Sequence, residues 1–504
     1  MNQIKAGVVL NYVIIGLNTL LGLLYTPYML RCLGQNEYGL YSLVASVIAY
    51  LTILDFGFGN AIVRYTAKFR TEGHLTKQWE MFGMFLIIYS IIGVIALCGG
   101  SLLYFNVDTL FDRTMSPEDL AQARTMMVFL IVNLAFTFPF SIFGSIITAY
   151  EDFIFQKVVQ ITRILLCTGT LIVLLYWGYK AVAMVIVQTV FNIGTLFCNF
   201  LYCRYRLKIK IWFRKFDWTF LKEVIIYSFW IFLNAIMDRI YWGTGQFVLG
   251  SISGTIAVAI FSVAITLQGM YMMFSTSLAG VLLPRITAMV TRNKSDKEIS
   301  DLFISTGRLQ AIIMLLILSG FTVFGKGFIN LWAGSDYSAS YSITMIFFVT
   351  LFIPLIQNVG LSILQARNQM KFRSLCYVFI AIVSLGCQIW LSDIMGALGC
   401  AIAIGGALLL GQGVVMNIYY AVRQHLDIMK FWKEIGGMMI VPTILTGLGL
   451  LSRHYVDYSN LINLCLGILI FVIIYLPLFY RFGMNKRERE LILAPVQKIL
   501  YKLK

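Results

Sequence analysis

The chain has 504 residues, of which 59% are hydrophobic and 12% are charged, with a mean hydropathy of +0.83 and a formal net charge of +16. Soluble globular proteins carry roughly 25% charged residues, so this chain has too few to cover a water-facing surface of its size. These values exclude a soluble enzyme, a secreted disulfide-bonded scaffold and a disordered protein, and they indicate a polytopic membrane protein.

Long apolar runs bounded by charged residues predict the membrane spans. Each run is about as long as the roughly 20 residues that a spanning helix needs, and it lacks the alternation of an outer-membrane strand. An all-α protein is therefore predicted, with about 14 transmembrane helices and both termini on one side. In chain order, the predicted helices are 8–30, 38–62, 81–105, 124–149, 158–178, 181–202, 223–249, 254–283, 308–325, 341–363, 375–392, 396–420, 436–452 and 459–480.

The distribution of positive charge orients these helices. With a cytoplasmic N-terminus, 31 of the 39 Lys and Arg residues fall in segments predicted to face the cytoplasm, and 6 fall in outward segments. This asymmetry follows the positive-inside rule and predicts that both termini are cytoplasmic. The densest run, 204–222, is predicted to be an amphipathic interfacial linker, although an RNA-binding patch has a similar composition. Loops facing anionic lipid explain the net charge, so no nucleic-acid partner is predicted.

A weak internal repeat suggests how the chain is organised. A shift of 216 residues aligns Asn18 with Asn234, Gly34 with Gly250 and Lys157 with Arg373, although chance matches are common in such a composition. Parallel repeats occur in several transporter folds. We expect two six-helix lobes separated by a basic cytoplasmic linker, followed by two further helices and a basic cytoplasmic tail. The predicted bounds are 1–203 for the N-lobe, 204–222 for the linker, 223–423 for the C-lobe, 424–480 for the two helices and 481–504 for the tail.

No pattern of catalytic or metal-binding residues occurs. The three His lie in loops or at span edges, and the nine Cys are scattered without a CxxC pair. The sequence also lacks the common motifs of hydrolases, metalloproteases and P-loop ATPases. We therefore predict a protein that is not an enzyme, with no catalytic residues, no metal site and no cofactor.

Ionisable and amide side chains inside spans or close to their ends are the candidates for a polar substrate path, because charge is costly in the bilayer. For each candidate, the alternative is an interhelical contact or a cation that reaches the headgroups. The candidates are Asn18, Asp55, Arg64, Asn234, Asp238, Arg239 and Arg285.

Spacing along the helices separates some of these candidates. Asp55 and Arg64 are nine residues, or about two and a half turns, apart, so they do not pair on one straight helix. Gly57 and Gly59 lie between them and could loosen that helix. Asp238 and Arg239 are adjacent and diverge by about 100°, so they face different neighbours.

Two motifs around the second predicted span, LGQNEYGLYSL at 33–43 and LDFGFGNAIVRY at 54–65, resemble the N-terminal signature of Wzx-type bacterial polysaccharide flippases. These belong to the multidrug/oligosaccharidyl-lipid/polysaccharide (MOP) superfamily and serve O-antigen and capsule synthesis. The resemblance implies a MATE-like fold in the bacterial inner membrane, with a charged cavity between two lobes. It carries over directly to Asp55 and Arg64, and to Arg285 only through the repeat alignment.

The same resemblance implies a flippase that moves an undecaprenyl-pyrophosphate-linked oligosaccharide from the cytoplasmic to the periplasmic leaflet by alternating access. The implied partners are this lipid-linked oligosaccharide, membrane lipids and other polysaccharide-assembly membrane proteins. A proton or sodium gradient could drive transport, and Asp55 and Asp238 are the intramembrane acids that could couple to it.

Three alternatives remain open. A lipid II flippase of the same superfamily would handle the peptidoglycan precursor. A cation-coupled multidrug exporter would have a more apolar pocket and usually fewer spans. A membrane-embedded glycan polymerase or ligase would need a large outward loop with catalytic residues, and the longest predicted outward segment, 106–123, is short and lacks His.

Overall fold

The computed structural model describes residues 3–214, 216–292, 294–367 and 369–490. Within these residues the regular structure is helical, and no strand is assigned. Contacts along the chain divide it into two compact units: unit 1 is residues 1–262 and 388–400, and unit 2 is residues 263–387 and 401–504. The lobe bounds predicted from the internal repeat remain a prediction.

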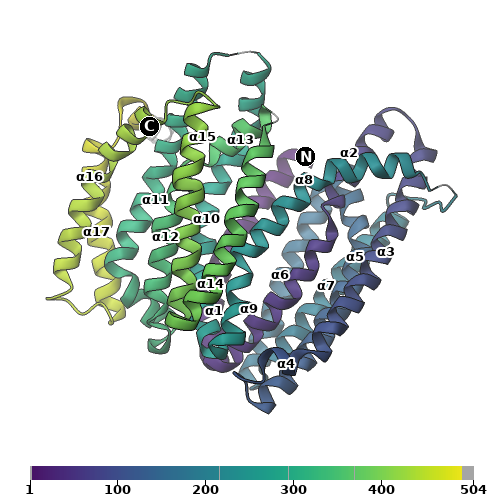
Figure 1. Ribbon diagram of the computed structural model, residues 1–504, viewed down its shortest axis with the longest axis horizontal. Helices are drawn as coiled ribbons and strands as arrows, with labels where there is room; N and C mark the ends of the chain where they lie inside the picture. The colour runs from purple at the N-terminus through teal and green to yellow at the C-terminus, as the bar shows by residue number, and fades with distance from the viewer. Residues whose placement is uncertain (1–2, 215, 293, 368, 491–504) are drawn as a thin grey trace, which may run out of the picture. The chain divides into compact units, whose positions relative to one another are not determined.

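In unit 1, long helices pack side by side, as α3, α5 and α7 do in Figure 1. Its elements are α1 (Gln3–Leu51), the 3₁₀ turn η1 (Thr52–Asp55), α2 (Phe58–Thr71), α3 (Leu75–Phe105), α4 (Val107–Phe111), α5 (Pro117–Ala149), α6 (Phe153–Tyr176), α7 (Ala181–Tyr205), α8 (Trp218–Trp242), α9 (Thr244–Ile252) and the start of α10 (Gly254–Thr291). Helix α5 packs against α3 and α7, and α1 packs against α6. The core is strongly aromatic, with Phe82, Phe85 and Tyr89 of α3 fully buried.

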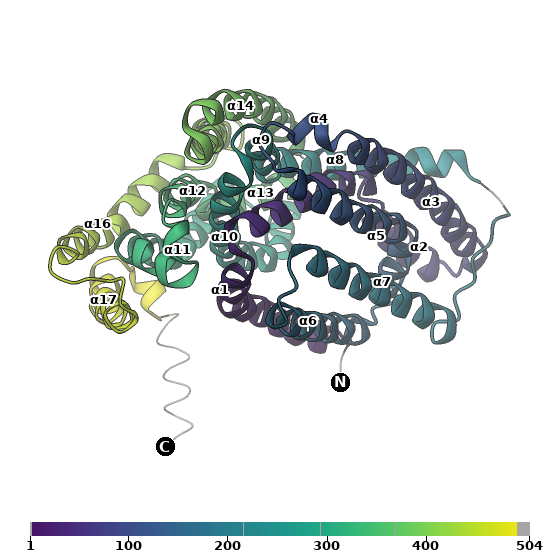
Figure 2. The ribbon, with the colours of Figure 1, turned by 90° about the horizontal axis from the view of Figure 1, so that it is seen from below.

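Unit 2 centres on α11, which packs against α12, α16 and α17. Figure 2 shows α16 and α17 beside α11 at one side of this unit. Its elements are the rest of α10, α11 (Asp296–Trp332), the 3₁₀ turn η2 (Ser335–Tyr337), α12 (Ser340–Ile356), α13 (Asn358–Ala366), α14 (Met370–Leu408) outside 388–400, the π-helical turn η3 (Leu409–Val415), α15 (Met416–Val422), α16 (Ile428–Ser452) and α17 (Leu461–Phe482).

The all-helical membrane fold predicted from the sequence is confirmed, although the helices group differently. Eleven helices of the described chain are long and apolar enough to cross a membrane. Two of them, Val9–Thr71 and Met370–Val422, have 63 and 53 residues, and each contains two predicted spans. The paired spans join at Gly34 (φ 71°) and Gly396 (φ 56°), where a kink needs a left-handed backbone that favours glycine. The predicted span 223–249 forms α8 and α9, which are not among the eleven.

One predicted helix, 308–325, is too short. Helix α11 begins at Asp296, where Ser295 and Glu298 form a capping box: each side chain accepts a hydrogen bond from the other residue's backbone N–H. The first turns of α11 carry several charged residues, so a prediction from apolar runs places the start of this helix too late. They carry Arg308, only 6% exposed, into the interior of unit 2.

Arg308 makes a buried ion cluster that joins three segments of unit 2. Its Nε donates to Glu488 Oε1 at 2.6 Å and its Nη2 donates to Glu488 Oε2 at 2.9 Å. Its Nη1 donates to Glu434 Oε2 of α16 at 2.8 Å, and Nη2 also donates to the Gly483 carbonyl at 3.1 Å. We call Arg308, Glu434 and Glu488 the clamp. It fastens α16 and the chain after α17 to α11.

Candidate functional site

The second predicted span is not one continuous helix. Helix α1 ends at Leu51, η1 follows, Phe56 (φ 52°) and Gly57 (φ 70°) take left-handed conformations, and α2 begins at Phe58. Two consecutive left-handed residues cannot continue an α-helix. The prediction of a helix over 38–62 is therefore wrong at 52–57, and the suggestion that glycine loosens it applies at Gly57. The break leaves polar side chains in the middle of an apolar segment.

Asp55 lies at this break and accepts a hydrogen bond from a residue of α3. The Tyr89 hydroxyl donates to Asp55 Oδ1 at 2.9 Å, and Tyr89 itself is fully buried. The Phe58 ring lies edge-on to the Tyr89 ring at 6.2 Å between centroids. The Gly57 backbone N–H also donates to this carboxylate. An ionised carboxylate has about four lone-pair sites, so these two donors leave Asp55 with capacity to accept further hydrogen bonds.

Arg239 of α8 reaches the same break. Its Nη2 donates to Thr52 Oγ1 at 3.0 Å. Thr52 and Asp55 are three residues apart on a 3₁₀ turn, in which side chains at i and i+3 eclipse and rise by about 6 Å. The Arg239 guanidinium therefore binds to the face of η1 that also carries Asp55.

Further hydroxyls complete the group. The Tyr50 hydroxyl, at the end of α1, donates to Thr244 Oγ1 of α9 at 2.5 Å, and the Phe56 ring stacks on the α8 residue Phe232 at 4.4 Å. We call this group the break cluster, and it comprises Tyr50, Thr52, Asp55, Tyr89, Arg239 and Thr244. It combines one cation, one acid and four hydroxyls, which are groups that can bind phosphate and sugar hydroxyls.

The other predicted candidates lie elsewhere. Arg64 is exposed, and its guanidinium lies 5.6 Å from the ring centroid of Tyr65. The Tyr65 hydroxyl donates to Glu223 Oε1 at 2.8 Å, which joins α2 to the first turns of α8. Glu223 is sixteen residues before Arg239, or about 24 Å along the helix. Arg64 therefore lies far along the helix axis from the break cluster.

For the other four candidates, which are two amides and two charged residues, the structure gives less detail. Asp238 and Asn18 have exposed side chains. The side chains of Asn234 and Arg285 lie outside those that the structure describes. Of the seven candidates, the structure brings Asp55 and Arg239 to one turn.

Sequence reasoning missed the hydroxyls of the break cluster. Tyr89 and Thr244 belong to no sequence motif, and Thr52 is a common residue for a membrane helix; only the tertiary contacts identify them.

A second buried polar group, in unit 2, was missed for the same reason. There Gln357 Nε2 and Trp432 Nε1 donate to Asn417 Oδ1 at 2.8 and 2.9 Å, and Asn417 donates to two carbonyls of η3. Uncharged amides inside predicted spans were the available signal.

Among the described residues, no three His, Cys, Asp or Glu side chains lie close enough to hold a metal ion.

Comparison with known proteins adds a family and a fold. The model of a family described as "Polysaccharide biosynthesis protein" matches residues 4–290, more than half of the chain. A Shigella flexneri protein named "Putative O-antigen transporter" is 18% identical over 405 residues, which are 80% of this chain and 94% of that protein.

Solved structures share the fold at low sequence identity. The lipid II flippase MurJ in an inward closed conformation has a TM-score of 0.71 and 16% identity, over 94% of this chain and 99% of that one. An inward-facing multidrug-resistance transporter of the MATE family and MOP superfamily has a TM-score of 0.62 and 14% identity, over 79% and 92%. These proteins are transporters or flippases and not enzymes, in agreement with the prediction for this chain.

Proposed function

Since the chain belongs to the family of polysaccharide biosynthesis proteins, we propose that it is a flippase for an undecaprenyl-pyrophosphate-linked oligosaccharide. It moves this lipid from the cytoplasmic to the periplasmic leaflet of the bacterial inner membrane by alternating access. The observation that carries the substrate class is the match to the Shigella flexneri protein over 94% of its length. Other polysaccharide-assembly membrane proteins are its proposed partners.

The break cluster is the proposed contact point for the polar part of the substrate. A diphosphate and a glycan cannot cross hydrocarbon unsolvated, so a flippase needs cations for the phosphates and hydrogen-bonding groups for the sugar hydroxyls. Arg239 supplies a cation and Thr52 a hydroxyl at η1, and Tyr50 and Thr244 supply two more hydroxyls, joined to Arg239 through its carbonyl. The polyprenyl chain remains in lipid while the head group is exposed to one side of the membrane at a time.

The remaining predicted residues are assigned to substrate contact or to ion coupling in this proposal. Arg64 lies in the middle of α2, on the cytoplasmic side of the break in the proposed orientation, and would meet the diphosphate first. Asn18, Asn234, Asp238 and Arg285 remain candidates for the substrate path. Asp55 is the proposed acid for coupling to a proton or sodium gradient, because its contacts with Tyr89 and Gly57 leave acceptor sites open.

A lipid II flippase is the second candidate. The observation that favours it is the similarity to MurJ over 94% of this chain. At 16% identity that similarity supports a common fold, and the family match and the Shigella flexneri relative favour the oligosaccharide.

The deciding experiment is mass spectrometry of lipids from cells depleted of this protein and from the same cells after it is restored. Accumulation of an undecaprenyl-pyrophosphate oligosaccharide, together with loss of surface polysaccharide, is expected and would identify the glycan. Accumulation of lipid II with cell lysis would replace the proposal by the second candidate. No change in either lipid would refute both.

A further inference from the structure

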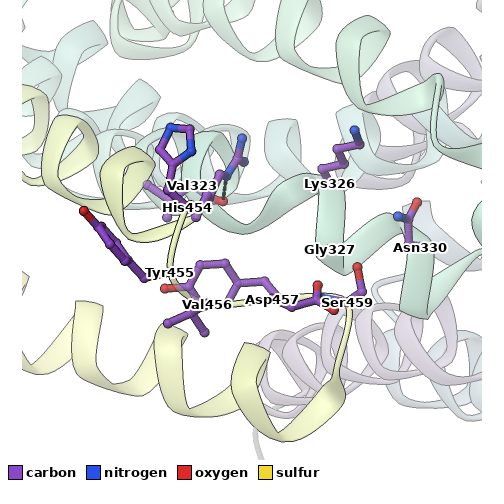
Figure 3. Close-up of a pocket in the computed structure, with 11 residues that line it drawn as sticks. Val323, Lys326, Gly327, Asn330, His454, Tyr455, Val456, Asp457 and Ser459 are labelled. Atoms are coloured by element: carbon purple, nitrogen blue, oxygen red, sulfur yellow. Dashed lines mark hydrogen bonds between the residues drawn. The ribbon is translucent and has the colours of Figure 1, made fainter.

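A polar pocket lies at the end of unit 2 that is remote from the clamp. Its walls are Val323–Asn330 of α11 and the connection between α16 and α17, residues 453–459, and it encloses about 450 Å³ (Figure 3). Along α11, Lys326 is eighteen residues after Arg308, or about 27 Å, close to the roughly 30 Å thickness of the bilayer's hydrocarbon core. This separation would place the clamp and the pocket near opposite faces of the membrane. In the proposed orientation, the pocket faces the outer side.

The connecting loop is fixed against α11, so the pocket is preformed. The Tyr458 carbonyl lies 2.4 Å from the place that a Cβ on Gly327 would occupy, which only glycine permits. The Tyr458 hydroxyl and Ser452 Oγ are 2.8 Å apart, and the Tyr458 ring meets the Phe324 ring edge-on at 5.0 Å. Asn463 Nδ2 donates to the Asp457 carbonyl at 3.0 Å. A rigid site of this kind needs little ordering when it binds a ligand.

The lining carries more positive than negative charge. Arg453 Nε and Nη2 donate to the carbonyls of Val323 and Thr322, both at 2.6 Å, and carbonyls orient a guanidinium without neutralising it. Lys326 also lines the pocket, and no salt bridge within the described part of the chain involves Lys326 or Arg453. The carboxylate of Asp457 accepts the Ser459 N–H at 2.8 Å.

Two further polar groups belong to the pocket. His454 and Lys326 extend toward the same side of it in Figure 3. Asn330 Oδ1 is buried and has no hydrogen-bond partner among the described residues. Buried polar atoms are normally paired, so this unpaired oxygen, in a pocket that Lys326 and Arg453 also line, indicates a place for a polar ligand. The amide can present either its oxygen or its NH₂ group, because the two differ by a flip.

We propose that this pocket binds the phosphate group of a membrane lipid. Lys326 would act as a mobile point charge and Arg453 as a fixed one, an arrangement suited to a phosphate, while the Asn330 amide would donate to a phosphate oxygen. The adjoining Tyr455 is 89% exposed, and tyrosine is enriched where protein meets the lipid headgroups. The phosphate would belong to an anionic phospholipid or to a polyprenyl phosphate. This site lies beyond the proposed function and does not depend on it.

Native mass spectrometry of the delipidated full chain tests this site without a transport assay. The probes are dioleoylphosphatidylglycerol, undecaprenyl phosphate and, as a zwitterionic comparison, dioleoylphosphatidylcholine. We expect Lys326→Gln to weaken binding of an anionic probe about fivefold, because one lysine near a membrane surface contributes about that factor. Lys326→Arg retains the charge and should bind as the wild type does.

A matched control is Arg113→Gln, which removes an exposed cation from a predicted outward segment of unit 1. The probe that Lys326→Gln weakens identifies the lipid, and weakening of either anionic probe supports the site. Equal binding of both anionic probes by Lys326→Gln and the wild type would overturn the proposal. An equal loss of anionic-probe binding in Arg113→Gln would also overturn the proposal, because any exposed cation would then have the same effect as Lys326.

Discussion

Replacing Arg308 with Ala tests how strongly the clamp stabilises unit 2. The substitution leaves Glu488, which is 3% exposed, without its arginine. Asn485 still donates its backbone N–H and its Nδ2 to that carboxylate, at 2.9 and 3.1 Å. Removing one partner of a buried pair costs about 3–5 kcal/mol, and these two hydrogen bonds keep the expected cost near the lower end. Glu434, whose side chain is 41% exposed, can turn to water, so Glu434→Gln should cost below about 1 kcal/mol.

The assay is thermal unfolding of the purified, detergent-solubilised chain, with limited proteolysis after α17 as a second measurement. Arg308→Ala should lower the Tm by several degrees and expose the chain beyond Phe482 to protease, because the clamp fastens that segment. Glu434→Gln should change neither measurement appreciably. If the two variants lowered the Tm equally, burial of the Arg308–Glu488 pair would not be the source of the stability.

Three further predictions concern the break cluster and its surroundings. Arg239→Ala and Arg64→Ala should each reduce surface polysaccharide while the protein inserts at normal abundance, because each removes a cation from the proposed path; normal polysaccharide in both variants would remove these residues from it. Asp55→Asn should abolish the dependence of transport on the ion gradient in proteoliposomes, and an unchanged dependence would exclude Asp55 as the coupling acid. Gly57→Ala should destabilise the protein by about 1–2 kcal/mol, since Gly57 has φ 70°, and an unchanged Tm would mean that the break relaxes without cost.

The sequence by itself determined which segments are helical. Each predicted span overlaps helical structure, although 38–62 is interrupted at 52–57 and 223–249 is divided between α8 and α9. The physical reason is local: inside a bilayer, a segment must satisfy its own backbone hydrogen bonds, so a long apolar run becomes a helix whatever its neighbours are. The 33–43 and 54–65 motifs also indicated the correct family.

Only the tertiary structure decided where those helices break and which polar groups meet. The left-handed pair Phe56–Gly57 interrupts a run that is apolar enough to continue. Arg239 meets Thr52 across 187 residues of chain, and Arg308 meets Glu488 across 180. Hydropathy and spacing describe one segment at a time, whereas these contacts depend on how segments pack. A buried charge is stable only where another segment brings its partner, so the sequence listed candidate residues and the packing selected among them.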